Sequence, residues 1–416
     1  MDKSAIKEIV FDQNKAKQSK DLIKREVFVK AESSIKNPFV IVLSGVRRCG
    51  KSTLLGQIRE KYPGYYLNFD DERLVNFKLE DFQGLYEIFL ELYGENGIFY
   101  FDEIQNISGW ERFVRRLRDE EKKVFVSGSN ASMLSRELGT HLTGRHLSIT
   151  LFPFSFREFL VFNNFNLDKD STHVTETKAK IKRYFEDYLL NGGMPEYVKT
   201  KNKDYLKILY ENIIYRDILV RYGINNEKAF KELVSLAINS LSKEISFNSI
   251  KKLLKLGSST TVKEYFDKLE NSYLVFLLPR FDFSLKKQIN SNKKVYVIDN
   301  AIASYLGFKF SKDLGKLLEN LVFIELKRKE KELYYFSEKK ECDFVVREGA
   351  KIIEAIQVCY DFNDENRERE VAGLLEALEK FKLKEGIILT YDQEEEIKEK
   401  GKRIIVKPVW KWLLEK

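Results

Sequence analysis

The first third of the chain alternates short apolar runs with segments whose apolar residues recur at helical spacing. The runs have the length and composition of buried strands, and the segments at 79–93 and 109–120 are amphipathic. Strands that alternate with helices are typical of a parallel sheet covered by helices. The sequence therefore predicts an α/β fold here, preceded by amphipathic helices in residues 1–37. The predicted strands are residues 39–43, 65–69, 97–101 and 123–127.

The pattern changes twice further along the chain. Residues 176–224 are periodic at helical spacing, which predicts a helical lid. Residues 226–298 predict helix, helix, a short turn, helix and two strands, the order of a winged helix-turn-helix. From residue 315 onward, a helix followed by strands predicts a second α/β domain. The expected domains are 1–160, 161–225, 226–305 and 306–416.

One turn in the first sheet has the spacing of a phosphate-binding loop. Gly45 and Gly50 are followed by Lys51 and Ser52, after a strand and before a helix, an order that disfavours a chance match. The glycines let backbone N–H groups point at phosphate oxygens, and the helix N-terminus adds positive potential. Lys51 would reach the β and γ phosphates, and Ser52 would hold Mg²⁺. The predicted nucleotide-binding residues are Gly45, Val46, Arg47, Arg48, Cys49, Gly50, Lys51, Ser52, Thr53 and Leu54.

Two carboxylates close the strand at 97–101. Asp102 and Glu103 have the layout of a metal-binding acid followed by a base that activates the attacking water. We therefore expect Asp102 to join Ser52 at Mg²⁺, and Glu103 and Lys51 to act in catalysis. The alternative is that the acid pair caps a helix, which is less favoured once a phosphate-binding loop stands upstream.

Composition and charge narrow the class of protein. The 416 residues are 43% hydrophobic, which suits about two or three domains that each have a core. The 72 Lys and Arg exceed the 64 Asp and Glu by 8, a mild excess that permits nucleic acid as a partner. Three cysteines without metal-ligand spacing, a charged N-terminus and no apolar run of about 20 residues predict a cytoplasmic protein without a membrane segment.

Several short motifs together resemble one family. They are GVRRCGKST at the loop, YFDEIQ, VSGSN, a GR pair followed by LFPFSFREFL, and NGGMPEYV at 191–198. The set resembles the archaeal and bacterial AAA-type ATPases that share a C-terminal domain, and the similarity covers nearly the whole chain. The resemblance implies an ATPase core that binds ATP and Mg²⁺, a small helical lid, a winged helix and a C-terminal endonuclease-like fold. It is also compatible with a homo-oligomeric ring.

Three further side chains are candidates for contact with the γ-phosphate. Ser129 and Asn130 follow the strand at 123–127, where a phosphate sensor would lie, although both residue types are also common in turns. Arg145 would stabilise the charge that spreads over the transferring phosphoryl group, from the same chain or from a neighbouring one. The alternative for Arg145 is a surface ion pair.

A basic stretch predicts DNA as a partner. Residues 243–294 hold 11 Lys or Arg against 5 Asp or Glu, most of the excess of the whole chain. In a winged helix, the first turn of the third helix contacts phosphates or base edges. That helix has no arginine here, so we expect recognition by shape and backbone charge. A winged helix that contacts protein is the alternative. The candidate DNA contacts are Lys251, Lys252, Ser259, Thr260, Thr261, Lys263, Lys286 and Lys287.

The C-terminal segment carries carboxylates in an arrangement similar to restriction-endonuclease-like folds. Glu319 lies on the first helix and Asp343 on a strand, and the next strand offers Glu354 or Gln357. Such carboxylates jointly hold Mg²⁺ and activate water for phosphodiester hydrolysis. That strand should also carry a lysine, but Ile356 stands at its place after Glu354, and the register at Gln357 lacks both acid and lysine. Without the ammonium, we expect a domain kept for binding or assembly.

The favoured function is a Mg²⁺-dependent ATPase that binds double-stranded or branched DNA and couples hydrolysis to remodelling or translocation. Two alternatives stay open. One is a nucleotide switch in signalling or defence whose winged helix binds protein partners, and the other is an ATP-gated nuclease. ATP hydrolysis that DNA stimulates favours the first function, and capture of a protein without DNA favours the switch.

Overall fold

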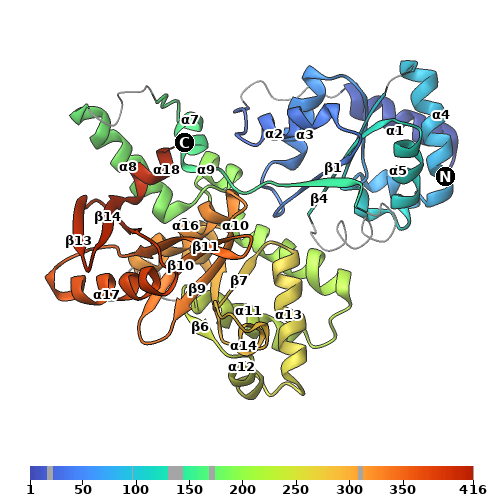
Figure 1. Cartoon of the computed structure of the whole chain (residues 1–416). Coiled ribbons are helices and arrows are strands. Elements are labelled where there is room, and N and C mark those ends of the chain that lie inside the picture. The colour runs from blue at the N-terminus through green and yellow to red at the C-terminus, as the bar shows by residue number, and fades with distance from the viewer. Residues whose placement is uncertain (16–21, 96, 130–143, 168–173, 308–312, 416) are drawn as a thin grey trace. The chain divides into compact units, whose positions relative to one another are not determined.

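The chain folds as two units, Met1–Phe152 and Pro153–Lys416, in a computed structural model. The structure describes residues 1–15, 22–95, 97–129, 144–167, 174–307 and 313–415 (Figure 1). Within these stretches, no helix is long and apolar enough to cross a lipid bilayer.

A five-stranded parallel sheet forms the centre of the first unit, in the order β2-β3-β4-β1-β5. This confirms the predicted parallel α/β sheet and adds β5, which the sequence did not indicate. The carboxyl ends of parallel strands meet at one edge, so the loop after β1 and the acids after β3 lie along the same edge. However, β4 lies between β1 and β3, so the acids are not on the strand next to the loop. The strands are β1 Val40–Ser44, β2 Tyr65–Asn68, β3 Ile98–Asp102, β4 Lys123–Gly128 and β5 His146–Thr150.

Helices cover both faces of this sheet, and β1, β3 and β4 accordingly bury residues on both sides. On one face, α1, α4 and α5 share an aromatic core with the sheet, in which Phe82 and Phe113 stack at 4.5 Å and Trp110 is fully buried. On the other, α3 runs from the loop across β3 and β4. The helices are α1 Lys3–Lys15, α2 Phe28–Ser33, α3 Lys51–Lys61, α4 Phe82–Tyr93 and α5 Trp110–Asp119, with 3-10 turns at Ser34–Lys36, Glu72–Leu74, Leu79–Asp81 and Ile104–Asn106.

The second unit begins with helices joined by a tight glycine turn. The N–H of Gly193 donates to Oδ2 of Asp299 at 2.7 Å, and its carbonyl accepts from the N–H of Phe154 at 2.7 Å. A Cβ on Gly193 would lie 2.3 Å from the carbonyl oxygen of Phe154, so only glycine fits. The NGGMPEYV motif therefore has a packing role. The helices are α7 Phe156–Phe162, α8 Thr175–Asn191, α9 Pro195–Thr200 and α10 Lys203–Asn212, followed by a π-helical segment, Ile213–Val220.

Three helices and a small antiparallel sheet, in the order β6-β8-β7, follow next. Aromatic pairs join the helices: Phe230 meets Tyr265 edge to face at 5.2 Å, and Phe247 stacks on Phe266 at 5.6 Å. The short β6 and α14 are additions to the elements that the periodicity predicted. The elements are α11 Glu227–Asn239, β6 Glu244–Ile245, α12 Phe247–Leu253, α13 Ser259–Asn271, β7 Val275–Pro279, α14 Leu285–Asn290, β8 Lys293–Val297 and α15 Asn300–Leu306.

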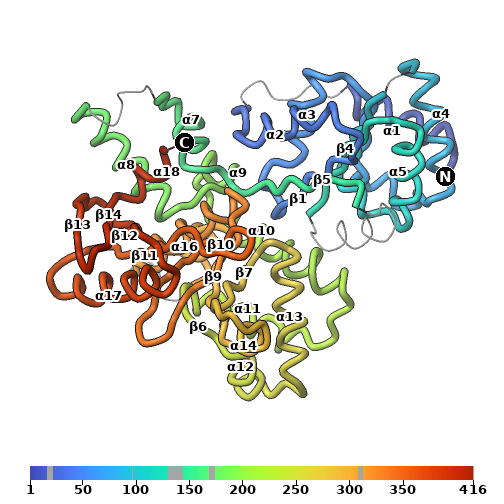
Figure 2. Tube along the Cα trace, viewed as in Figure 1, coloured from blue at the N-terminus to red at the C-terminus, as the bar shows by residue number. Residues whose placement is uncertain are grey.

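A mixed six-stranded sheet, in the order β13-β14-β12-β11-β10-β9, completes the second unit (Figure 2). Adjacent residues of β10 face opposite sides. Val345 packs in the core beneath α17, and Phe344 contacts Phe323 of α16. The strands are β9 Glu332–Ser337, β10 Glu341–Glu348, β11 Lys351–Val358, β12 Glu385–Thr390, β13 Glu395–Glu399 and β14 Lys402–Pro408. The helices are α16 Leu314–Arg328, α17 Asp364–Lys380 and α18 Val409–Leu414.

We predict that Gly193→Ala lowers the free energy of unfolding by about 1–3 kcal/mol, the usual cost of forcing extra volume into a packed site. The new methyl group would meet the backbone of Phe154, which cannot rotate away. Chemical denaturation followed by circular dichroism measures the change. Gly257→Ala is the matched control in the same unit, because no heavy atom lies within 4 Å of its added Cβ. Equal stability of the two variants would contradict the packing role.

Candidate functional site

The loop between β1 and α3 has the backbone of a phosphate cradle. Gly50 adopts a left-handed conformation with φ 102° at the start of α3, which residues with a side chain rarely adopt. Gly45 has φ 148°, and a Cβ there would lie 2.1 Å from the carbonyl oxygen of Leu151. Both predicted glycines therefore have a structural reason, and together they shape a turn that opens at a helix N-terminus.

The other loop residues divide by burial. The side chains of Val46 and Cys49 are in the core, so they offer a nucleotide only their backbone, and burial raises the pKa of the Cys49 thiol. Arg48 is exposed, with a left-handed φ of 65°. Four more residues of the loop and of the first turn of α3 are predicted to bind nucleotide. Arg47 and Thr53 are half-buried, Ser52 is exposed and Leu54 is buried.

The ammonium group of Lys51 is buried against the loop. It donates to the carbonyl oxygens of Gly45 and Val46, both at 3.2 Å, and lies 3.7 Å from Oε1 of Glu103. Burial by itself would lower the pKa of Lys51, but the charge of Glu103 raises it above its usual value. The group therefore stays cationic at the edge where a phosphate would bind.

Arg25 braces the loop, although no motif in the sequence marks this residue. Its buried guanidinium donates to the carbonyl oxygens of Cys49 and Phe152, each at 2.7 Å. A Cβ on Gly50 would lie 3.2 Å from Nη1 of Arg25. From the sequence, a buried arginine in a charged N-terminal segment cannot be told from a solvent-exposed one. The two carbonyl groups that Arg25 contacts are distant from it in sequence, so no local pattern marks the contact.

Asp102 is fully buried at the end of β3. Its carboxylate accepts hydrogen bonds from the hydroxyl groups of Ser127, on β4, and Tyr66, on β2, the latter at 3.2 Å. Burial and the adjacent charge of Glu103 raise the pKa of Asp102, while hydrogen bonds from Ser127 and Ser52 oppose the rise. The structure thus brings Ser52 and Asp102 together, as the sequence predicted, and this hydroxyl–carboxylate pair offers the oxygen ligands that Mg²⁺ prefers.

Glu103 follows in a left-handed backbone conformation, with φ 50° and ψ 40°. This conformation is unusual for a residue other than glycine and places the carboxylate over the loop rather than along the strand. Its N–H donates to the hydroxyl of Ser127 at 3.1 Å, and its Oε2 accepts from Nε2 of Gln105 at 2.5 Å. Ser127, which the sequence analysis missed, therefore holds both acids in place.

The end of β4 leaves a polar atom without a partner. The Ser129 hydroxyl is buried and has no hydrogen-bond partner among the described residues. Leaving a buried hydroxyl unpaired is unfavourable, so this atom fits a ligand that supplies an acceptor such as a phosphate oxygen. Asn130, the other predicted sensor, lies outside the described residues.

Arg145 lies at the edge of the sheet opposite to the loop. Its carbonyl oxygen accepts from the N–H of Val40 at the start of β1, whose five residues extend about 15 Å before the loop begins. The guanidinium is half-exposed, 3.7 Å from Asp119. The structure therefore has the surface ion pair, and Arg145 does not reach the loop of its own chain. A role at the nucleotide of a neighbouring chain stays a prediction.

The predicted DNA contacts lie on α12, α13 and α14. The hydroxyl of Ser258 caps α13 by accepting from the N–H of Thr261 at 3.1 Å, as expected for the start of a helix. Lys294, which contributed to the basic excess of this stretch, is buried instead. The exposed candidates are Lys252, Thr260, Lys263, Lys286 and Lys287, and the half-buried ones are Lys251, Ser259 and Thr261.

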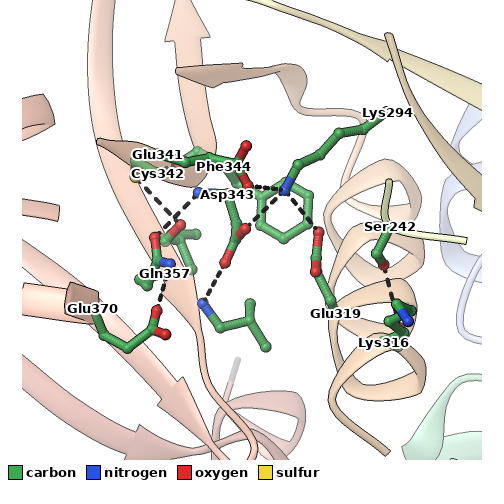
Figure 3. Close-up of polar contacts among 12 residues, drawn as sticks. Ser242, Lys294, Lys316, Glu319, Glu341, Cys342, Asp343, Phe344, Gln357 and Glu370 are labelled. Atoms are coloured by element: carbon green, nitrogen blue, oxygen red, sulfur yellow. Dashed lines mark hydrogen bonds and ion pairs between the residues drawn. The ribbon is translucent and has the colours of Figure 1, made fainter. Parts of the chain in front are cut away.

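A second cluster of buried charges lies where β8, α16 and β10 meet (Figure 3). The ammonium of Lys294, on β8, lies 2.8 Å from Oδ1 of Asp343 and 3.1 Å from Oε1 of Glu319. It also lies 2.8 Å from Oε1 of Glu341, and the Lys294 side chain is only 3% exposed. The endonuclease-like pattern predicts this ammonium on β11, which has no lysine at that place, but a lysine of β8 supplies it.

Hydrogen bonds tie the cluster to β11. The N–H of Asp343 donates to Oε1 of Gln357 at 3.2 Å, and Oδ2 of Asp343 accepts from the N–H of Val358 at 2.9 Å. The structure therefore places Gln357 at the cluster, one of the two registers that the sequence left open. Glu354 is not part of it and lies 3.5 Å from the ammonium of Lys331.

The ammonium neutralises much of the charge of the cluster. Burial alone would lower the pKa of Lys294, but Asp343 and Glu319 raise it well above its usual value. Burial raises the pKa of Glu319 to about 7, although the hydroxyl of Tyr296 donates to it at 2.7 Å. In the described part of the chain, no group of three or more His, Cys, Asp or Glu is arranged to hold a metal ion. The geometry fits an internal ion-pair network.

Comparison with known proteins places the loop within a recognised domain. Residues 37–160 match the AAA domain family, and residues 182–313 and 314–412 match two domains of unknown function. The uncharacterized protein MJ1544 of Methanocaldococcus jannaschii is 36% identical over 434 residues, which cover 99% of this chain and 96% of that protein. An uncharacterized protein of Haemophilus influenzae is 30% identical over 416 residues, which cover 95% of this chain and 100% of that protein.

Solved structures give a weaker likeness. A RuvB variant of Thermotoga maritima is similar over 66% of this chain and 94% of its own, at 14% identity and a TM-score of 0.31. A score this low says nothing about function.

We predict that Lys294→Met destabilises the chain by about 3–5 kcal/mol at neutral pH, because it leaves buried carboxylates without their counter-charge. Without the ammonium the pKa of Glu319 rises further, so the folded state holds a proton that the unfolded state has lost, and stability falls as pH rises. The difference from wild type should therefore be larger at about pH 8 than at about pH 5, where Glu319 is protonated. Urea titrations at both pH values measure it.

The control for this prediction is Lys398→Met, a lysine on β13 whose side chain is 80% exposed. A loss of stability that does not change with pH would mean that packing, rather than charge, accounts for the effect of Lys294.

Proposed function

We propose that this chain, which belongs to the same family as MJ1544 and carries an AAA domain at residues 37–160, binds and hydrolyses ATP at the loop after β1 and acts on DNA. The observation that carries the proposal is the meeting of Lys51, Ser52, Asp102 and Glu103 along one edge of the sheet. These four groups supply a cation for phosphate, oxygen ligands for a metal ion and a carboxylate for water.

Each residue of the site would have a distinct role in ATP binding or hydrolysis. Backbone N–H groups of the loop and the ammonium of Lys51 would bind the β and γ phosphates, since that ammonium holds its charge although buried. Ser52 and Asp102 would hold Mg²⁺, which when bound neutralises charge on the phosphate oxygens. Glu103 would orient and polarise the attacking water, with its carboxylate held by Gln105. Ser129 would donate to the γ-phosphate.

We predict that Glu103→Gln binds ATP as the wild type does but hydrolyses it at least about tenfold more slowly, because the amide cannot accept a proton from water. Isothermal titration calorimetry measures binding, and phosphate release measures turnover. Glu120→Gln, at the end of α5 and half-exposed, is the matched control. Unchanged turnover in Glu103→Gln would place the catalytic base elsewhere.

The DNA part of the proposal is supported by the second unit. The order α11, β6, α12, α13, β7, β8, with an antiparallel sheet, supports a winged helix-turn-helix, in which α13 would be the recognition helix. The exposed Lys252, Lys263, Lys286 and Lys287 would contact phosphates. Because none of them is an arginine, we propose binding to duplex or branched DNA with little base readout, coupled to remodelling or translocation.

We predict that replacing Lys252 and Lys263 by Gln weakens duplex binding about equally for all sequences and lowers the slope of log K against log salt by about 1 for each lysine that contacts a phosphate. Fluorescence anisotropy at several salt concentrations measures both. Lys398→Gln with Lys400→Gln removes the same charge from exposed lysines on another surface and serves as control. An unchanged slope would favour a nucleotide switch whose winged helix binds protein.

We do not propose that the C-terminal sheet cleaves DNA. The carboxylates of Glu319 and Asp343 that would hold Mg²⁺ both face the ammonium of Lys294, at 3.1 and 2.8 Å. A cation bound between them would have to displace a buried charge from the same oxygens. We therefore propose that the C-terminal sheet serves binding or assembly. We also propose that the chain forms a homo-oligomeric ring in which Arg145 contacts the nucleotide of a neighbouring chain.

A further inference from the structure

The connection between β7 and β8 exposes three large apolar side chains in one short stretch. Phe283 is 75% exposed, Leu285 is 69% exposed and Ile289 is 61% exposed. Single exposed apolar residues are common on protein surfaces, but three within seven positions are unusual and make this connection a candidate interaction surface. We call Phe283, Leu285 and Ile289 the apolar patch.

Hydrogen bonds hold the connection in one conformation. The N–H of Ser284 donates to Oδ1 of Asp282 at 2.8 Å, and Nε2 of Gln288 donates to the carbonyl oxygen of Asp282 at 2.5 Å. At the other end, the ammonium of Lys293 donates to the carbonyl oxygen of Ser291 at 2.8 Å. A braced connection presents its apolar residues to solvent instead of collapsing onto the neighbouring surface, so the patch is preorganised for a partner.

The charge around the apolar patch is positive. Residues 280–293 carry Arg280, Lys286, Lys287 and Lys293 against one carboxylate, Asp282. Lys263 of α13 lies near enough to add to burial in lowering the pKa of Lys293. The positive field therefore continues from the apolar patch to the helix that we propose contacts DNA, which favours a polyanionic partner.

A hollow of about 490 Å³ opens beside Phe283. Its lining includes the cations Arg280, Lys287 and Lys380 and the carboxylates Asp282 and Glu338. The ring of Phe281 also lines it and meets Phe283 edge to face at 5.3 Å. The ring of Phe381 lies 6.4 Å from that of Phe283. Phe283, which is 75% exposed, therefore lies beside a space whose rim carries more cations than carboxylates, a combination that suits base stacking and phosphate contact.

We propose that the β7–β8 connection is a DNA wedge: the apolar patch inserts at unpaired or weakly paired bases, and one unstacked base lies on Phe283 at the hollow. The inference rests on the proposed DNA binding and specifies which DNA is preferred. Apolar wedges flanked by cations unstack base steps in duplexes, and the step is least unfavourable where pairing is already lost. The chain should therefore prefer forks, mismatches and junctions over a fully paired duplex.

The test compares two DNA probes with the full-length chain. One is a fully paired duplex, and the other is the same duplex with a short internal run of mismatches. We expect the wild type to bind the mismatched probe about tenfold more tightly, the worth of about one stacked base. Phe283→Ala should remove this preference and leave duplex affinity unchanged, and Phe283→Trp should restore it. Phe11→Ala, at an exposed phenylalanine of the first unit, is the control.

A second readout places the base at the wedge. A 2-aminopurine in the mismatched run should change its fluorescence on addition of wild type and of Phe11→Ala, but not on addition of Phe283→Ala. Circular dichroism melting confirms that Phe283→Ala remains folded, which its exposure leads us to expect.

Three outcomes would overturn the inference. Binding of duplex without any preference for the mismatched probe would leave the proposed DNA function intact and remove only the wedge. A preference that persists in Phe283→Ala would place the recognition elsewhere. Binding of neither DNA probe would overturn the wedge and the DNA function together, and binding of anionic vesicles that Phe283→Ala abolishes would then assign the apolar patch to a membrane surface.

Discussion

The structure depends on two lysine ammonium groups that are buried and must therefore be paired. An isolated buried charge is strongly unfavourable, so each lysine fixes the groups around it. Lys294 meets three carboxylates within 3.1 Å, and its charge is satisfied inside the protein. Among the described residues, Lys51 has one carboxylate partner, Glu103 at 3.7 Å, and donates to two backbone carbonyl oxygens. The first arrangement holds a domain together, and the second leaves a cation that an incoming phosphate can pair more closely.

The local parts of the fold could be predicted from the sequence, and the parts that depend on distant contacts could not. Buried strands such as Val40–Ser44 and Ile98–Asp102 are almost continuous apolar runs, so their composition and length identify them. By contrast, β5 has exposed positions at Leu147 and Ser148, and β13 has the sequence EEIKE with four exposed residues. Edge strands like these pair through the backbone and carry little hydrophobic signal.

The same division applies to the candidate site. The loop motif identified Lys51 and Ser52 because glycine spacing and helix start are adjacent in sequence. Arg25, Ser127 and Lys294 act through contacts that join separate elements, and no spacing in the sequence marks them. The lysine expected on β11 is on β8 for this reason. An ammonium group can reach a carboxylate cluster from any strand that packs beside the cluster.

Strand β8 also explains why the apolar patch can act as a wedge. Adjacent residues of a strand face opposite sides, so Lys293 turns toward the β7–β8 connection while Lys294 enters the carboxylate cluster. The connection is further tied to the C-terminal sheet, since the N–H of Phe281 donates to the carbonyl oxygen of Tyr335 at 2.7 Å. A wedge can separate nucleobases only if the segment that carries it is held firmly by the rest of the protein. The buried ion pairs of Lys294 fix the start of β8, to which this connection leads, so the charge cluster supports the proposed wedge.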